Sequence, residues 1–230
     1  MKLPLLVSVP HAGTDVPLEV KDLCLLTDED IIEDGDKGAI EIYGALEYEA
    51  TAFKKADVAR AIVDLNCSED DRSRDGVVKT HTIWLQPVYS RRLPNEVIEL
   101  LIDRYWRPYH ASLSKLAGCG GALGVDCHTM VDVSPSIDPE PGTLRPAVCI
   151  SNADGTCPDE WLMGLASAFE GSFGAEVKIN KPFTGGYIIR SHARELPWVQ
   201  IEISRGSFMS DEEKAKCLIK ALSEWCKKVL

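Results

Sequence analysis

The sequence has 230 residues, of which 45% are hydrophobic and 27% are charged, and its formal net charge at pH 7 is −11. This composition is typical of a globular protein that buries its core without disulfides or other cross-links. The acidic excess and the lack of a long basic run argue against a nucleic-acid partner, because phosphates require clustered lysine and arginine. The length fits one α/β domain over residues 1–230, with no repeat or linker.

The N-terminal segment, MKLPLLVSVP, carries one lysine and only a short apolar run. It is too short to span a membrane, and it lacks the small-residue cleavage site of a signal peptide. We therefore predict a cytoplasmic protein without a membrane partner. None of the eight cysteines forms a C-x-x-C pair, and in a reducing compartment most should be small buried hydrophobic side chains. These features leave the oligomeric state open.

Short apolar runs rich in β-branched residues predict the strands of a core. Most lack a clean alternation of apolar and polar residues, which is typical of strands covered on both faces. In chain order the predicted strands are Leu3–Val9, Ala59–Leu65, Ala122–Cys127, Ala147–Ile150, Glu176–Ile179, Tyr187–Ile189 and Val199–Ile203.

Helical periodicity lies between these runs. Apolar residues recur at steps of three and four in Asn95–Leu116, where Pro108 could kink the helix or divide it. Ser210 and Glu213 form a capping box before a closing helix that ends near Val229. Strands alternating with helices predict a three-layer α/β/α fold with a central, mostly parallel or mixed sheet. Two polar or proline-rich segments predict long loops, Ser68–Lys79 and Ser134–Arg145.

Polar side chains that a core does not need collect where several predicted strands end. In α/β proteins, ligands bind at the carboxyl ends of the strands. The residues concerned are His11 after the first strand, Asp64 and Asn66 after the second, Asp126 and His128 at the third, and Gln200, Glu202 and Arg205 in the last.

The alternation of side chains along a strand sharpens this pattern. Residues two apart point to the same face, so Asp126 and His128 share a side, whereas Cys127 faces away. A nucleophile or ligand pair of Cys127 with His128 is therefore disfavoured. Gln200 and Glu202 likewise share one face of an otherwise apolar strand. A lone buried carboxylate is strongly disfavoured, so Glu202 must be paired or functional.

Each of these residues also has a structural interpretation. A histidine at a strand end often does no more than form hydrogen bonds, which we expect for His81, His110 and His192. Asp64 and Asn66 could hold a turn. Glu202 could be half of an ion pair with either Arg190 or Arg205. The gathering of so many polar groups at strand ends nevertheless favours a site.

The histidines and carboxylates at the strand ends fit a catalytic zinc site, which needs about three histidine or carboxylate ligands and an open position for water. A separate glutamate can then act as general base. The sequence contains no Cys₄ pattern, G-x-G-x-x-G, G-x-x-x-x-G-K or G-x-S-x-G to support another mechanism. His11-Ala-Gly-Thr is not H-E-x-x-H, so local spacing alone leaves the ligands open.

Motifs along the whole chain resemble those of the N-formylglutamate amidohydrolase family, which is similar in fold to zinc carboxypeptidases and aspartoacylase-type deacylases. No single motif is decisive, but their number and order are specific. They are SVPHAG with Pro17, DGDKGA (Asp34–Ala39), IVDLN (Ile62–Asn66), RPYHASL (Arg107–Leu113), VDCHTM (Val125–Met130), NKPFTGGYIIR (Asn180–Arg190) and VQIEISRGSFM (Val199–Met209).

The resemblance implies hydrolysis of an N-acyl amide on a small acidic amino acid, most specifically N-formyl-L-glutamate, with one bound Zn²⁺. His11 and His128 would be metal ligands. Asp36 lies in a matching motif and would be the third, with Asp15 as the alternative. Glu202 matches the glutamate that deprotonates the attacking water and returns the proton to the leaving amine.

The resemblance also implies residues that bind the substrate. Glycine in the TGGY turn would let the backbone approach the substrate, and arginine binds carboxylates in a bidentate manner. The implied residues are Asn66, Gly185, Gly186, Tyr187, Arg190 and Arg205.

One departure bears on the substrate. The family pattern after the second strand is Asp-x-Asn-Arg, but Cys67 stands in place of that arginine. Either Arg72 or Arg74 replaces it from the following loop, or the substrate is a different N-acyl amino acid or peptide. A non-catalytic binding protein on the same fold is the remaining alternative, and the embedded Glu202 argues against it.

Overall fold

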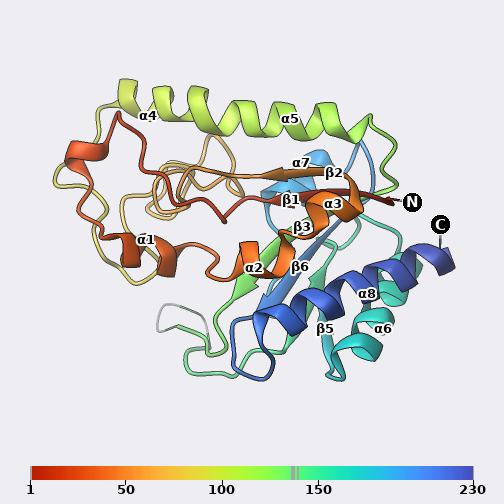
Figure 1. Ribbon diagram of the computed structural model, residues 1–230. Helices are drawn as coiled ribbons and strands as arrows, with labels where there is room; N and C mark the ends of the chain where they lie inside the picture. Colours follow the sequence, from red (N-terminus) through yellow and green to blue (C-terminus); the bar gives the residue numbers. More distant parts are fainter. Residues whose placement is uncertain (1, 136–137, 139, 230) are drawn as a thin grey trace.

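The computed structural model describes residues 2–135, 138 and 140–229, and its centre is a six-stranded sheet in the order β2-β1-β3-β6-β4-β5 (Figure 1). Neighbouring strands are parallel except for β4 and β6, which are antiparallel. The strands are β1 (Leu3–Val9), β2 (Ala50–Lys55), β3 (Leu123–Met130), β4 (Val148–Ser151), β5 (Val177–Ile179) and β6 (Trp198–Ser204).

Helices cover both faces of this sheet, which confirms the predicted three-layer α/β/α fold. The long α4–α5 segment lies on one side of the sheet in Figure 1, and α6 and α8 lie on the other. The helices are η1 (Lys21–Leu23), α1 (Asp28–Asp34), α2 (Ala39–Tyr43), α3 (Leu46–Glu49), α4 (Asn95–Leu101), η2 (Ile102–Trp106), α5 (Arg107–Ala117), α6 (Asp159–Phe173), α7 (Tyr187–His192) and α8 (Asp211–Val229). No helix of the described chain is long and apolar enough to cross a membrane.

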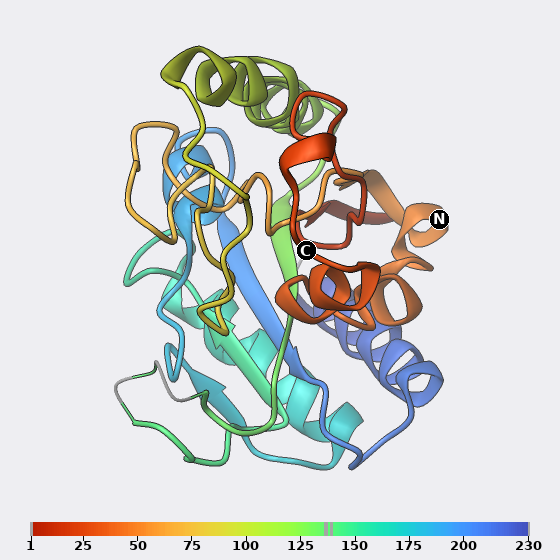
Figure 2. The same ribbon diagram turned by 90° about the vertical axis from the view of Figure 1, so that its left-hand side faces the viewer.

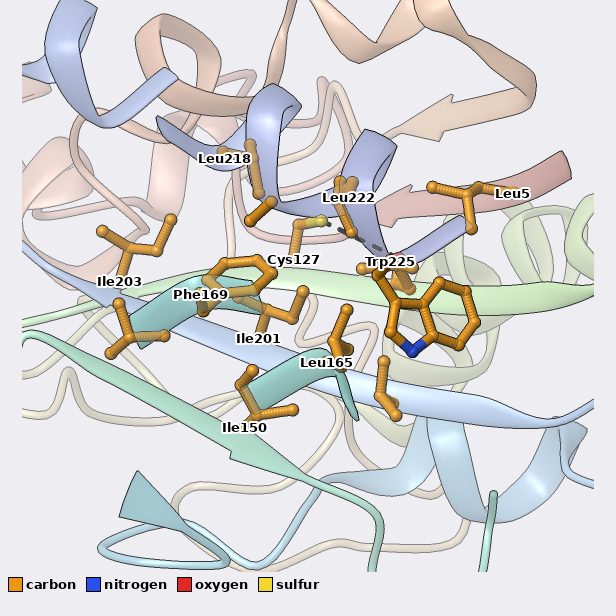
Figure 3. Close-up of a cluster of buried hydrophobic side chains, with 14 of the residues drawn as sticks. Leu5, Cys127, Ile150, Leu165, Phe169, Ile201, Ile203, Leu218, Leu222 and Trp225 are labelled. Atoms are coloured by element: carbon orange, nitrogen blue, oxygen red, sulfur yellow. Dashed lines mark hydrogen bonds between the residues drawn. The ribbon is translucent and has the colours of Figure 1, made fainter. Parts of the chain in front are cut away.

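Two hydrophobic clusters form the core, one on each face of the sheet. Successive strand residues supply opposite clusters: Leu5 belongs to the first and Leu6 to the second. This explains why the strands lack an apolar–polar alternation. Figure 3 shows part of the first cluster, where strand residues meet α6 and α8: Leu5, Cys127, Ile150, Ile201 and Ile203 pack near Leu165, Phe169, Leu218, Leu222 and Trp225.

The predicted helices are confirmed. Ser210 and Glu213 cap α8 reciprocally: the Glu213 N–H donates to Ser210 Oγ at 3.3 Å, and the Ser210 N–H donates to Glu213 Oε2 at 3.0 Å. The segment from Asn95 to Ala117 is helical throughout, with η2 in π geometry between α4 and α5. Pro108 lies directly after the π turn, at the second position of α5, and does not divide the helical segment.

Two predicted strands are wrong. Ala59–Leu65 is a series of turns, in which the Val63 N–H donates to Ala59 O at 3.0 Å. Its apolar residues are buried in the second cluster, so their composition reflected burial rather than an extended backbone. Tyr187–Ile189 opens helix α7. In contrast, β2 was not predicted, because this edge strand ends in two lysines and has few β-branched residues.

The predicted loop Ser68–Lys79 contains no helix or strand. The predicted loop Ser134–Arg145 is described only in part, since residues 136–137 and 139 lie outside the described chain. The cysteines are free, and four of them are buried as expected (Cys127, Cys149, Cys157 and Cys226), whereas Cys119 is exposed.

Candidate metal centre and active site

The register between β3 and β6 places the first two pairs of polar side chains of the site opposite one another. His128 lies directly opposite Glu202, and Asp126 lies opposite Gln200. Both strands extend to residues 130 and 204, so these side chains belong to the strands themselves rather than to the loops after them. The sheet therefore fixes the spacing between a histidine and a glutamate.

Loops bring two further side chains to the same place. His11 follows β1, and the Asp36 N–H donates to the His11 carbonyl at 3.0 Å, which ties the segment after α1 to the end of β1. Figure 2 views the molecule from the side on which β1, β3 and β6 end, and the segment from residue 56 to residue 94 lies on that side.

Three side-chain atoms converge at this point. His128 Nδ1 lies 3.0 Å from Asp36 Oδ2 and 3.2 Å from His11 Nδ1, and His11 Nδ1 lies 3.7 Å from Asp36 Oδ2. All three residues are buried, with 3–7% of their surface exposed. They form the one cluster among the described residues whose donor atoms could hold a metal ion.

The outer nitrogens of both imidazoles are occupied. His11 Nε2 donates to Asp64 Oδ1 at 2.9 Å, and His128 Nε2 donates to Asp126 Oδ2 at 2.8 Å. With hydrogens placed there, each Nδ1 presents a lone pair to the centre. The two nitrogens and the Asp36 carboxylate oxygen then face one another at distances suited to binding a cation.

The outer carboxylates are themselves held in place. Asp126 accepts a hydrogen bond from Ser8 Oγ at 2.8 Å, and Asp64 accepts one from Arg60 Nε at 3.1 Å. Burial raises the pKa of Asp64, but neighbouring His11 and Arg60 outweigh it and hold that pKa well below its usual range. An ionised carboxylate behind a histidine fixes the ring orientation and increases the basicity of the ligand nitrogen.

The donor set fits a tetrahedral metal. With metal–nitrogen and metal–oxygen bonds of about 2.0–2.1 Å, neighbouring ligand atoms lie about 3.3 Å apart. The observed separations of 3.0, 3.2 and 3.7 Å bracket that value. Asp15, the alternative third ligand, is not in the cluster: its backbone pairs with Asp57 and Val58, and it lines a different cavity.

Glu202 is buried beside this centre, with 6% of its surface exposed. Its Oε1 accepts a hydrogen bond from Gln200 Nε2 at 2.8 Å. Burial, with a further contribution from nearby Asp36, raises the pKa of Glu202 to about 7. Within the described chain it forms no ion pair with Arg190 or Arg205, so the structural interpretation of Glu202 is not supported.

A cavity of about 450 Å³ opens over the cluster, a size suited to a small-molecule ligand. Most of the predicted site residues line it together: His11, Asp36, Asn66, His128, Gly185, Gly186, Glu202 and Arg205. Residues that sequence reasoning missed also line it, notably Arg60, Thr129, Arg145 and Phe183. The position of Arg60, four residues before Asp64, was the available signal for the first of these.

Four predicted substrate-binding residues lie outside the lining of this cavity, so their contact with substrate stays a prediction. Arg72 pairs with Glu99 at 2.6 Å, and Arg74 pairs with its neighbour at 3.0 Å. Arg190 is exposed on α7, and Tyr187 lies against the ring of Trp106, with centroids 5.7 Å apart. Arg72 and Arg74 follow Cys67 closely in sequence, but their side chains pair with Glu99 and Asp75.

The TGGY turn needs its glycines for another reason than expected. A Cβ on Gly186 would lie 2.2 Å from Asn66 Nδ2, and the Gly186 N–H donates to Gln200 Oε1 at 2.7 Å. Asn66 Oδ1 in turn accepts from the Ile188 N–H at 2.8 Å. The close approach is thus between this turn and Asn66, which joins two walls of the cavity.

The guanidinium of Arg205 is hydrogen-bonded mainly to other protein groups. Its Nε donates to Thr129 Oγ1 at 3.0 Å, its Nη2 donates to the Thr129 and Gly35 carbonyls, and Asp36 Oδ1 lies 3.6 Å away. These contacts fix the segment that carries Asp36. They leave little of the guanidinium to bind a substrate.

Comparisons with known proteins agree along nearly the whole chain. The family model for N-formylglutamate amidohydrolase matches residues 3–209. The N-formylglutamate deformylase of Pseudomonas putida is 25% identical, covering 92% of this chain and 84% of the relative. The N-formylglutamate deformylase of Pseudomonas aeruginosa is 24% identical, with the same coverage of 92% and 84%.

Solved structures share the fold. N-formylglutamate amidohydrolase from Ralstonia eutropha JMP134 has a TM-score of 0.77 at 21% identity, covering 99% of this chain and 93% of that one. A gene product of Agrobacterium tumefaciens has a TM-score of 0.76 at 17% identity, covering 100% and 91%. The family model and the fold confirm the resemblance seen in the motifs: the chain belongs to the N-formylglutamate amidohydrolase family, hydrolases that act on an amide C–N bond.

Proposed function

We propose that this protein hydrolyses N-formyl-L-glutamate to formate and L-glutamate, with one divalent metal held by His11, Asp36 and His128. The observation that carries the proposal is the convergence of two imidazole Nδ1 atoms and a carboxylate oxygen beside buried Glu202. The names of the family and of its curated relatives supply the substrate.

The donor chemistry favours zinc. Zn²⁺ binds imidazole nitrogen and carboxylate oxygen, and its catalytic sites keep a position open for water or substrate. When bound, the metal would polarise the scissile carbonyl and lower the pKa of a coordinated water. The carboxylates of Asp64 and Asp126, hydrogen-bonded to the outer nitrogens, orient the two histidines for this role.

Glu202 supplies the proton transfers. A general base works best when its pKa is close to the operating pH, and burial raises the pKa of Glu202 to about 7. Its carboxylate takes a proton from the attacking water as the water oxygen bonds to the formyl carbon. The carboxylic acid then returns this proton to the nitrogen as the C–N bond breaks. Gln200, by donating to Oε1, orients the carboxylate.

A second candidate is hydrolysis of a different N-acyl amino acid, and Cys67 favours it. This residue replaces the arginine of the family pattern, and it does not line the cavity. Its Sγ donates to the Asp75 carbonyl at 3.5 Å, and its carbonyl accepts from Trp106 Nε1 at 2.9 Å. The side chain therefore offers no direct substitute for a carboxylate-binding group.

Glutamate release from N-formyl-L-glutamate by the purified protein tests both candidates. We expect release that a chelator abolishes and that added Zn²⁺ restores. N-acetyl-L-glutamate, N-formyl-L-aspartate and N-formyl-L-methionine, assayed in parallel, compare the acyl group and the side chain. Turnover of one of these without turnover of N-formyl-L-glutamate would establish the second candidate. Release that is insensitive to chelation would contradict the metal centre.

A further inference from the structure

Among the described residues, one arginine of the cavity leaves most of its donors without a protein partner. Within the described chain, the arginines that line the cavity are Arg60, Arg145 and Arg205. Arg60 donates to Asp64 Oδ2 and to the Asp34 carbonyl, each at 3.1 Å. Arg205 is held by backbone carbonyls and Thr129, as described above. Both cations therefore maintain the metal cluster and its surroundings.

Arg145 is in a different situation. Its side chain is only 7% exposed, yet its guanidinium forms a single hydrogen bond in the described structure, from Nη2 to Asp138. Its Nε is fully buried and has no hydrogen-bond partner among the described residues. The guanidinium carbon lies 4.9 Å from the centre of the Phe183 ring, which also lines the cavity. A buried donor without a partner is costly to retain, which suggests that a ligand completes it.

The backbone fixes where Arg145 enters the site. Val133 and Leu144 pair as an isolated antiparallel bridge, and the Arg145 N–H donates to the Asp132 carbonyl at 2.8 Å. The connection from β3 to β4 thus returns Arg145 to the end of β3. Cys67 reaches its place from the turns before residue 67, so the two positions belong to unrelated segments.

We propose that Arg145 binds a carboxylate of the acidic N-acyl substrate and so takes over the role of the arginine that Cys67 replaces. Guanidinium binds carboxylate in a planar, two-pronged geometry, and stacking on an aromatic ring holds that plane in place. The hydrogen bond to Asp138 demonstrates that the guanidinium accommodates a carboxylate at this wall of the cavity. The inference rests on the proposed function for the identity of the substrate.

Arg145→Gln tests the role by comparing three substrates: N-formyl-L-glutamate, its α-amide, and N-formyl-L-glutamine. Each amide lacks one carboxylate. We expect kcat/KM for N-formyl-L-glutamate to fall about 100-fold, mostly through KM. In wild type, kcat/KM for N-formyl-L-glutamate should exceed kcat/KM for each amide. In Arg145→Gln this ratio should fall to about threefold or less for one amide and persist for the other. The amide whose ratio falls identifies the carboxylate that Arg145 binds. Unchanged discrimination against both amides would overturn the proposal.

Three further variants separate ligand binding from structure. Asp138→Asn removes the protein's own partner of Arg145, so KM should fall or stay the same. A rise in KM equal to that of Arg145→Gln would assign the ion pair a structural role instead. Arg145→Lys keeps the charge but not the planar fork, and should recover only part of the lost affinity. Arg194→Gln changes an exposed arginine outside the cavity and is the matched control.

A binding measurement keeps this test independent of the reaction. Calorimetric titration of the zinc-loaded protein with glutarate, which has two carboxylates and no scissile bond, should give affinity that Arg145→Gln weakens at least 10-fold. If the wild-type protein hydrolyses no formyl amino acid but still shows this difference, the proposed function fails and the role of Arg145 stands. Equal affinity of the two proteins for glutarate would refute the role of Arg145 alone.

Discussion

Two pairs of histidines lie in this molecule, each with ring nitrogens in close contact. His11 and His128 approach with their Nδ1 atoms 3.2 Å apart, and His110 and His192 approach from Nδ1 to Nε2 at 2.9 Å. All four are buried. The first pair meets edge to face at 63°, whereas the second stacks at 5°.

The two pairs differ in what surrounds the inner nitrogens, meaning the ring nitrogens that face the other histidine of the pair. His110 Nε2 donates to the Leu65 carbonyl at 2.9 Å, so its Nδ1 is free to accept a hydrogen from His192. His192 Nδ1 contacts Glu195 Oε2 at 2.9 Å. A hydrogen shared between His110 Nδ1 and His192 Nε2 joins the two rings. No third ligand converges on this pair within the part of the chain that the structure describes, and neither histidine lines the candidate cavity.

The first pair has a third ligand atom beside its inner nitrogens. Each outer nitrogen donates to a carboxylate, and Asp36 brings a carboxylate oxygen to the two inner nitrogens as a third possible ligand atom. Proximity of two histidines is therefore no signature of a metal site. The distinguishing feature is whether a third ligand converges on the inner nitrogens.

The largest expected effect comes from removing one ligand. His128→Ala should abolish metal binding and lower turnover by more than about 1,000-fold, because the remaining two ligands leave the metal site incomplete. Metal content after gel filtration, measured by elemental analysis, checks this. The matched change His110→Ala in the second pair should leave the metal content at the wild-type value. Full metallation of His128→Ala would remove that residue from the centre.

Glu202→Gln should keep the metal and lose turnover by roughly 1,000-fold, within the range for loss of a general base. The amide is nearly the same size but cannot accept the proton of water. Activity of the wild-type protein should also decline as the pH falls and Glu202 becomes protonated. Bound metal favours the carboxylate, so this decline should lie below the pKa of about 7 found without metal. Loss of metal in Glu202→Gln would make Glu202 a ligand instead.

Asp64→Asn and Asp126→Asn change the partners of the outer nitrogens without touching the ligands. Each should weaken metal affinity by about 10–100-fold, the usual effect of removing a carboxylate behind a histidine ligand. Competition with a chelator of known affinity measures this. Glu195→Gln is the corresponding change behind the second pair, and it should leave metal affinity unaltered. If Glu195→Gln weakened affinity as much, the contrast between the pairs would fail.

His192→Gln should break the second pair and lower the free energy of unfolding by about 1–3 kcal/mol, because His110 Nδ1 is left buried without its partner. Urea unfolding at neutral pH measures this loss. Metal content should not change. A variant as stable as the wild type would show that this buried pair contributes nothing net.

The second pair should also make stability depend on pH. Burial lowers the pKa of His110 from 6.5 to about 4. Between these values the unfolded chain binds a proton that the folded chain does not, so the contribution to stability rises with pH and is lost on acidification. Acidification from pH 7 to pH 5 should lower the contribution of this histidine to the free energy of unfolding by about 2 kcal/mol. Urea unfolding of the wild type and His110→Gln at both pH values isolates the difference.

The strands that carry the chemistry were predictable, because β1, β3 and β6 combine apolar composition with polar residues that burial cannot explain. The alternation rule correctly placed Asp126 beside His128 and Gln200 beside Glu202. Ala59–Leu65 failed because turns can bury apolar residues as completely as strands do. Arg145 could not be predicted as a site residue, because its place in the cavity depends on tertiary contacts with Asp138 and Phe183 that no local sequence pattern indicates.

The three candidate ligands come from the end of β1, the turn after α1 and strand β3, so more than 100 residues separate the first from the last. An unfolded chain cannot hold them together, and binding of the metal therefore draws on the same equilibrium as folding. A metal present at 100 times its dissociation constant would add about 2.7 kcal/mol to the free energy of unfolding. Chelation would then lower the melting temperature as well as the activity, and the cell's supply of metal would help to set how much of the chain is folded.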